Sequence, residues 1–217
     1  MAAKENPMIK LHHLETSRSS RIIWLCEEGG IDYEMVRYAR DPKTRRSPAA
    51  LADVHRLAKA PTVEVDGHVM VESGAILEYL VERHSDGALG VAVDHPERAK
   101  YLEWLHFAEG TMGMSFIITG IAPMLGGLPE PWSGFLNSEV GKLLDHLEIE
   151  LEGKDFLVAD KFTGADINLH YMLEGRAAMG QLESRPNCKR YFEALVARPG
   201  YQKTVELGGP VLMARPS

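Results

Sequence analysis

An acidic residue and a hydroxyl residue, Glu72 and Ser73, stand next to each other immediately before a predicted helix. The apolar spacing of residues 75–80 predicts that helix, and Ser73 stands where its N-cap belongs. The free N–H groups of a helix N-terminus bind anions, and the carboxylate of Glu72 can accept a cation beside them. The pair therefore predicts a site for a zwitterion, such as the α-amino and α-carboxylate groups of an amino acid.

The segment that leads to this pair predicts a tight β-hairpin. A proline opens a valine-rich alternating run, Asp66-Gly67 fits a two-residue turn, and residues 68–71 return as the partner strand. Read in this order, residues 59–76 strongly resemble the glutathione-binding half of the glutathione S-transferase family. The resemblance implies that the acid–serine pair binds the γ-glutamyl end of glutathione. The alternative interpretation is an ordinary hairpin followed by an ordinary capped helix.

The same resemblance implies further contacts with glutathione. It implies a cis Ala60-Pro61 bond, with the backbone of Ala60 pairing with the cysteinyl backbone of glutathione like an added strand. Lys59 would meet the glycine carboxylate, and His55 is a second candidate, although either side chain can instead be an ordinary solvated one. Family members usually carry Asn-Pro-x-Gly before the lysine, whereas residues 55–58 read His-Arg-Leu-Ala. We therefore expect a different loop at the glycine end.

A turn rich in hydroxyl groups, residues 14–21, follows the first predicted strand. In the fold that the resemblance implies, this turn supplies the group that activates the thiol. A thiol reacts as its thiolate, and lowering a thiol pKa of about 8.5 by two units takes about 2.7 kcal/mol of preferential thiolate stabilisation. One short O–H···S⁻ hydrogen bond together with the positive end of a helix supplies energy of that order.

Four hydroxyl residues compete for this role. Ser17 matches the position of the serine or cysteine in the serine- and cysteine-type transferases, and Thr16 is the second candidate. Ser19 and Ser20 are expected inside the first helical turn, and each of the four can cap that helix instead. The turn contains neither tyrosine nor cysteine. This composition argues against the tyrosine-type mechanism, against glutathione-disulfide exchange and against a thioredoxin-like redox pair.

A second group of residues is expected to face the thiol. Glu109, Met112, Gly113 and Phe116 recur at helical spacing on a long helix predicted in the second half of the chain. Glutathione lying along the first domain would direct its thiol at this stripe, whose apolar members would form an adaptable wall for a small hydrophobic electrophile. Core packing between helices explains the stripe equally well, and we prefer that interpretation for Met112 alone.

The periodicity of the chain predicts two domains joined by a linker. A βαβ unit, a further helix, the hairpin and a last helix predict a thioredoxin-like α/β domain over residues 1–84. Residues 85–95 form the linker, and residues 96–217 predict an all-helical domain. The elements with the clearest limits are a strand at 8–14, helices at 17–28, 47–53, 97–114 and 135–152, and a capping box at 163–166.

Composition and charge exclude several classes of protein. The chain has 217 residues and a formal net charge of −7, which does not suggest a nucleic-acid-binding surface. The basic residues within 37–46 predict a solvated loop. No stretch approaches the ~20 apolar residues that span a bilayer, and the N-terminus lacks the apolar core of a signal peptide, so we expect a cytoplasmic protein. Two distant cysteines, Cys26 and Cys188, predict neither a disulfide framework nor a metal site.

These observations favour a homodimeric glutathione S-transferase with a serine-type site and a role in detoxification. It would take reduced glutathione as co-substrate, ionise its thiol and add the thiolate to an electrophilic carbon. Glutathione-dependent peroxide reduction needs the same activated thiolate and is an alternative. A second alternative is a transferase-like binding or regulatory module with little catalysis, although the hydroxyl-rich turn favours an enzyme.

Overall fold

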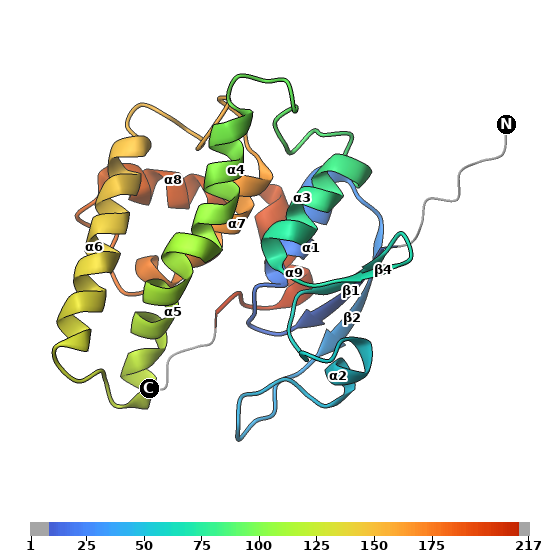
Figure 1. Cartoon of the computed structure of the whole chain (residues 1–217), viewed down its shortest axis with the longest axis horizontal. Coiled ribbons are helices and arrows are strands. Elements are labelled where there is room, and N and C mark those ends of the chain that lie inside the picture. Colours follow the sequence, from blue (N-terminus) through green and yellow to red (C-terminus); the bar gives the residue numbers. More distant parts are fainter. Residues whose placement is uncertain (1–8, 213–217) are drawn as a thin grey trace, which may run out of the picture. The chain divides into compact units, whose positions relative to one another are not determined.

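The computed structural model describes residues 9–212, which form two compact units (Figure 1). The first unit contains residues 9–86 together with Pro199–Val211, and the second contains Gly87–Arg198 together with Leu212. Met8, the first residue of the strand predicted at 8–14, lies outside the described residues, as do the N-terminal residues in which no signal peptide is predicted.

The first unit is a small mixed sheet with helices, and it has the predicted thioredoxin-like order. Its elements are β1 (Ile9–Leu14), α1 (Ser20–Gly29), β2 (Tyr33–Tyr38), α2 (Ala50–Val54), β3 (Thr62–Val65), β4 (His68–Met70), α3 (Ser73–His84) and, much later in the chain, α9 (Pro199–Gly208).

The sheet has the strand order β2-β1-β3-β4. β1 and β2 are parallel because α1 crosses over between them, whereas β3 is antiparallel to both β1 and β4. The hairpin between β3 and β4 turns at Asp66 (φ 50°) and Gly67 (φ 79°), the two positive φ angles that a type I′ turn needs. The predicted hairpin and the predicted fold class are confirmed.

α1 begins at Ser20, three residues after the predicted start. The reason lies in the preceding turn, where the hydroxyls of Ser17 and Ser19 bind the backbone of Leu14. Ser17 Oγ donates to Leu14 O at 2.7 Å, and Leu14 N donates to Ser19 Oγ at 3.2 Å. These contacts hold the serines in a turn rather than in a helix. From Ser20 onward the helix buries its apolar face in the core, as Ile22, Ile23 and Leu25 show, all 0% exposed.

α9 belongs to the first unit rather than to the helical domain predicted at 96–217. It packs against α1, with the rings of Trp24 and Tyr201 edge to face at 5.2 Å (Figure 1). Gly208 permits this approach, because a Cβ there would lie 2.7 Å from Ile23 Cδ1. The prediction included these residues in the helical domain without defining a helix there, and an apolar pattern does not show which domain will bury it.

The second unit is helical. Its elements are α4 (Arg98–Phe107), the π-helix η1 (Ala108–Met112), α5 (Gly113–Ile121), the 3₁₀-helix η2 (Ala122–Leu125), α6 (Trp132–Glu150), α7 (Gly164–Ala177) and α8 (Pro186–Val196). The prediction of one long α-helix at 97–114 is wrong, because the π-helical turn η1 interrupts it and α5 continues beyond it. The helix predicted at 135–152 is α6, which begins three residues earlier.

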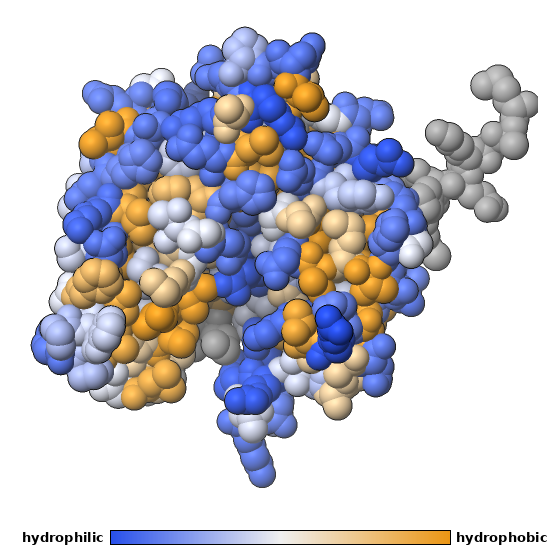
Figure 2. All heavy atoms as spheres, viewed as in Figure 1, coloured by the Kyte–Doolittle hydropathy of each residue, from blue (hydrophilic) through white to orange (hydrophobic). Residues whose placement is uncertain are grey.

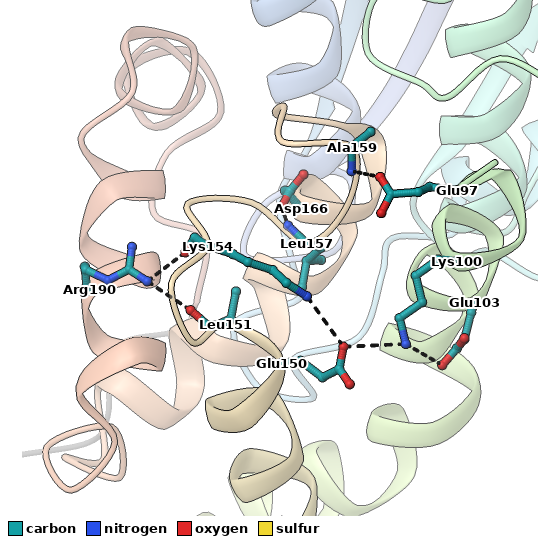
Figure 3. Close-up of polar contacts among 10 residues, drawn as sticks. All are labelled: Glu97, Lys100, Glu103, Glu150, Leu151, Lys154, Leu157, Ala159, Asp166 and Arg190. Carbon is teal, nitrogen blue, oxygen red and sulfur yellow. Dashed lines mark hydrogen bonds and ion pairs between the residues drawn. The ribbon is translucent and has the colours of Figure 1, made fainter. Parts of the chain in front are cut away.

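The predicted capping box starts α7 and is confirmed. Thr163 N donates to Asp166 Oδ2 at 2.8 Å, and Thr163 Oγ1 accepts from Ala165 N at 3.3 Å. The same carboxylate also receives Leu157 N, so it ties the loop after α6 to the start of α7 (Figure 3). Arg190 of α8 donates to two carbonyls of that loop. The box therefore has a structural role.

The surface of the helical unit carries apolar side chains as well as charged ones. Figure 2 shows orange, hydrophobic atoms over the lower parts of α5 and α6. The exposed apolar residues of this stretch of the chain include Met114 of α5, Leu125 of η2, and Trp132 and Phe135 of α6. Within residues 9–212, no helix is long and apolar enough to cross a membrane. The same residues contain no cluster of three or more side chains that could hold a metal ion.

Candidate functional site

The hydroxyl-rich turn joins β1 to α1 and presents its candidates at different depths. Ser17 is 7% exposed, Ser19 is 0% exposed, and Thr16 is half-buried. Ser17 Oγ lies 2.7 Å from Ser19 Oγ and accepts from Ser19 N at 3.2 Å. Ser20 donates back to Ser17 O at 3.1 Å. Thr16 is therefore the most exposed of the four residues, whereas Ser17 and Ser20, at 7% and 6%, are buried to the same degree and Ser19 is fully enclosed.

Arg40 holds the outer part of this turn. Its Nε donates to Glu15 O at 3.1 Å and to Thr16 Oγ1 at 3.2 Å, and its Nη2 donates to Thr16 O at 3.1 Å. Thr16 has a φ of 48°, which is rare for a β-branched residue and is kept here by those contacts. The basic pattern of residues 37–46 predicted that Arg40 lies in a solvated loop, whereas the structure shows it half-buried against the turn.

The acid–serine pair lies at the start of α3, but with roles that differ from the prediction. Ser73 is the first residue of the helix and Glu72 is the N-cap, so the prediction of Ser73 as N-cap is wrong. Ser73 is 4% exposed, and its hydroxyl accepts from Arg21 Nη1 at 2.9 Å. A buried guanidinium therefore uses the hydroxyl that the sequence assigned to the cap.

Glu72 adopts an unusual backbone conformation, with φ 73° and ψ 107°. Such angles in a non-glycine residue cost about 1–3 kcal/mol and concentrate at functional sites. Its side chain is exposed, and no residue within 9–212 forms a hydrogen bond or ion pair with its carboxylate. The carboxylate is therefore available to a cationic group of a ligand.

Arg21 connects the two halves of the candidate site. It lies on α1, one turn after Ser17, is 1% exposed, and reaches Ser73 at the start of α3. This contact brings the hydroxyl-rich turn and the Glu72 carboxylate to the same region of the first unit. The sequence pattern did not predict this contact, because Arg21 and Ser73 are 52 residues apart.

The loop before β3 holds the remaining residues predicted to bind glutathione. The Ala60-Pro61 bond is cis, as the resemblance implied. Lys59 is exposed, and its carbonyl accepts from Thr62 Oγ1 at 2.7 Å. His55 is half-buried, and its Nδ1 accepts from Leu57 N at 3.4 Å. Lys59 thus leaves its ammonium group in solvent, whereas His55 already has a contact within its own loop.

The chain matches two family models, "Glutathione S-transferase, N-terminal domain" over residues 6–82 and "Glutathione S-transferase, C-terminal domain" over residues 136–199. It is 30% identical to Glutathione S-transferase 3 of Schizosaccharomyces pombe over 92% of this chain and 87% of that protein. The chain belongs to the glutathione S-transferase family. This result confirms the family and the class of enzyme that the sequence predicted.

Solved structures of this family agree with the fold. A glutathione S-transferase from Actinobacillus pleuropneumoniae has a TM-score of 0.83 and 31% identity, covering 93% of each chain. A sphingomonad glutathione S-transferase complexed with glutathione has a TM-score of 0.73 and 25% identity, covering 92% of this chain and 98% of that one.

The stripe predicted to bind the electrophile lies around η1 of this transferase. Met112 is 0% exposed and Phe116 is 3% exposed, whereas Glu109 is half-buried. Arg176 lies over the Phe116 ring, 4.8 Å from its centroid, and its Nη2 donates to Phe116 O at 2.6 Å. Gly113 is buried at the start of α5. The π-helical turn changes the spacing within the stripe from that of a regular α-helix.

Both cysteines of this transferase are poor nucleophiles. Burial raises the pKa of Cys26 to about 12 and is also the main reason that the pKa of Cys188 rises to about 12. The thiolate is the reactive form, so both thiols stay protonated and inert near neutral pH. A thiol reaction in this protein therefore needs a thiol supplied by a ligand.

Proposed function

We propose that this protein binds reduced glutathione on its first unit and conjugates it to small electrophiles. The observation that carries the proposal is the Arg21–Ser73 contact, which brings a hydroxyl-rich turn and an exposed carboxylate together. Glu72 receives the α-amino group of the γ-glutamyl end, and the N–H groups at the start of α3 face its carboxylate. Ala60, beside Pro61, pairs with the cysteinyl backbone, and Lys59 or His55 meets the glycine carboxylate.

Ser17 donates the hydrogen bond that stabilises the thiolate, and Thr16 is the alternative donor. A hydrogen bond to a charged group is worth about 1.5–3 kcal/mol, or about one to two pKa units of the bound thiol. Ser17→Ala should therefore raise the pKa of bound glutathione by that amount. Its dissociation constant should stay within about twofold when it is measured below the pKa of the bound thiol, where glutathione binds as the neutral thiol.

Ultraviolet thiolate absorbance against pH measures the ionisation, and calorimetric titration measures the affinity. Thr16→Val is the matched variant, since it removes the other candidate hydroxyl of the same turn. A Ser17→Ala titration that overlays the parent, combined with a raised pKa in Thr16→Val, would move the role to Thr16. A panel of electrophiles and hydroperoxides then distinguishes conjugation from peroxide reduction.

The electrophile is proposed to meet the segment of Glu109, Met112, Gly113 and Phe116. The π-helical turn supports this proposal, since such turns are frequent at functional sites. The contacts of Arg176 with Phe116 instead favour a core role for that ring. Phe116→Ala should change the ranking of electrophiles at constant glutathione affinity, whereas a lower stability with an unchanged ranking would assign Phe116 to the core.

The homodimer and the cytoplasmic location expected from the sequence stay predictions. Sedimentation velocity measures the first and cell fractionation the second.

A further inference from the structure

A chain of buried hydrogen bonds runs from Ser17 into the interior of the first unit. Ser17 Oγ lies 2.7 Å from Ser19 Oγ, and Ser19 Oγ lies 2.9 Å from His13 Nδ1. The other ring nitrogen, His13 Nε2, lies 2.9 Å from Gly208 O of α9. Ser19 and His13 are 0% and 2% exposed. Of these side chains, Ser17 is the one nearest to solvent.

The direction of each hydrogen bond in this chain follows from the group at its inner end, the carbonyl of Gly208. A carbonyl oxygen only accepts, so His13 Nε2 carries a proton and donates to Gly208 O. A neutral imidazole has one N–H, so Nδ1 accepts, and Ser19 donates to it at 2.9 Å in preference to Leu14 O, which lies 3.2 Å from Ser19 Oγ. Ser19 has no second proton, and Ser17 therefore turns its own proton inward, toward Ser19 Oγ or toward Leu14 O, each 2.7 Å away. In the resting protein, the Ser17 proton points away from solvent.

The surroundings of His13 keep the imidazole neutral. Burial lowers the pKa of His13, the bond to Gly208 O raises it, and the nearby charges are Arg37 of β2, which lowers it, and Glu15 of the turn, which raises it. α9 is close because Gly208 lacks a side chain; a Cβ there would lie 3.3 Å from both Cε1 and Nε2 of the ring. Nδ1 is thus a free base at the end of a hydroxyl chain.

We propose that Ser17, Ser19 and His13 form a relay that takes up the proton of the bound thiol, an inference that rests on the function proposed above. The thiol proton passes to Ser17 Oγ, the Ser17 proton to Ser19 Oγ, and the Ser19 proton to His13 Nδ1. Each oxygen loses one O–H bond and gains another, the S–H bond breaks, and a new N–H bond forms. The products are a thiolate and an imidazolium, with no change in total charge.

The relay also explains how the O–H bond of Ser17 comes to point toward the sulfur. In the resting chain Ser17 points its proton inward, where it cannot stabilise a thiolate. After the transfer every hydrogen bond is reversed, so His13 donates to Ser19, Ser19 donates to Ser17, and Ser17 donates outward to the sulfur. Once the thiolate has added to the electrophile, the proton returns along the same chain and leaves through Ser17, to the anion formed on the electrophile in an addition, or to the leaving group or solvent in a substitution. Ser19 and His13 are therefore positioning residues that act through Ser17.

The protonation of His13 tests the relay directly. Imidazole ¹⁵N shifts of labelled protein, followed against pH, report the pKa of His13 in the complexes with glutathione and with S-methylglutathione, a thioether that has no thiol proton. We expect the pKa of His13 to be higher by at least about one unit, tenfold in proton affinity, in the glutathione complex. An identical His13 titration in the two saturated complexes would overturn the relay.

Three variants distinguish the relay from simple packing. Ser19→Ala should abolish the difference in His13 pKa between the two complexes and should raise the pKa of the bound thiol. Ser19→Thr keeps the hydroxyl, so it should show the same His13 pKa difference and the same thiol pKa as the parent. Thr204→Val removes another buried hydroxyl, which donates to Gly200 O at 2.8 Å, and should leave both readouts unchanged. If Ser19→Ala does not fold, the comparison of the His13 pKa between the two complexes of the parent protein still tests the relay. Failure of both ligands to bind would overturn the proposed function itself.

Discussion

Asp166 is the acceptor for four buried donors, and its removal should be among the most damaging single changes in the helical unit. Oδ1 accepts from Leu157 N at 3.1 Å and Tyr191 Oη at 2.8 Å, and Oδ2 accepts from Thr163 N at 2.8 Å and Thr163 Oγ1 at 2.9 Å. Asp166, Thr163 and Tyr191 are all 0% exposed, so water cannot replace the carboxylate.

The cost of Asp166→Ala follows from these contacts. Each donor left without an acceptor costs about 1 kcal/mol or more, which gives about 4 kcal/mol for the four. Removing a buried carboxylate also removes its desolvation penalty, which offsets part of that loss. We expect a net destabilisation of about 3 kcal/mol, equivalent to a fall of about 6–12 °C in the melting temperature of a chain of this length.

Differential scanning calorimetry and urea unfolding measure this loss. Asp155→Ala is the matched control, because it removes an aspartate that is 86% exposed and bonds Arg190 at 3.0 Å. An exposed pair of that kind contributes less than about 1 kcal/mol. If Asp166→Ala costs no more than Asp155→Ala, the assignment of the capping box as a buried anchor of the helical unit is wrong.

The remaining predictions concern the first unit. Glu72→Ala should weaken glutathione binding more than tenfold in a calorimetric titration, because a charge-assisted hydrogen bond of about 1.5–3 kcal/mol is lost; an unchanged dissociation constant would remove Glu72 from the site. His13 should make the protein less stable in acid. Its pKa in the folded state lies below the value of about 6.5 in the unfolded chain, so the unfolded chain binds the proton more tightly. The contribution of His13 to the free energy of unfolding is therefore fully present above about pH 6.5, and it is lost as pH falls from there toward the folded pKa. The urea midpoint should depend less on pH across that range in His13→Gln than in the parent. Equal dependence of the midpoint on pH in the two proteins would contradict a lowered pKa of His13 in the folded state.

The sequence predicted those features of the site that depend on local chemistry. The hairpin turn at Asp66-Gly67 and the capping box at Thr163 each follow from residues only a few positions apart, and the structure shows both. The pattern also placed Glu72 beside a helix start, although that helix begins at Ser73 itself rather than after it.

The residue pattern of the sequence could not predict contacts between distant segments. Arg21 and Arg40 reach partners 52 and 24 residues away, and a lone arginine in a sequence does not show what it will bind. The π-helical turn was missed for a different reason. Its residues, Ala108–Met112, carry the same apolar spacing as a short piece of α-helix, and the difference lies in the backbone.

The position of α9 has a consequence for the order in which this protein can fold. Synthesis delivers the N-terminal residues first, at about 5–20 residues per second. The first unit, however, remains incomplete until Pro199–Gly208 has left the ribosome, after all the helices of the second unit. Until then the side of α1 that contains Ile23 and Trp24 lacks its cover, and His13 lacks the carbonyl of Gly208. During synthesis this face of α1 therefore stays uncovered until α9 has been made, and it is open to chaperones for that time.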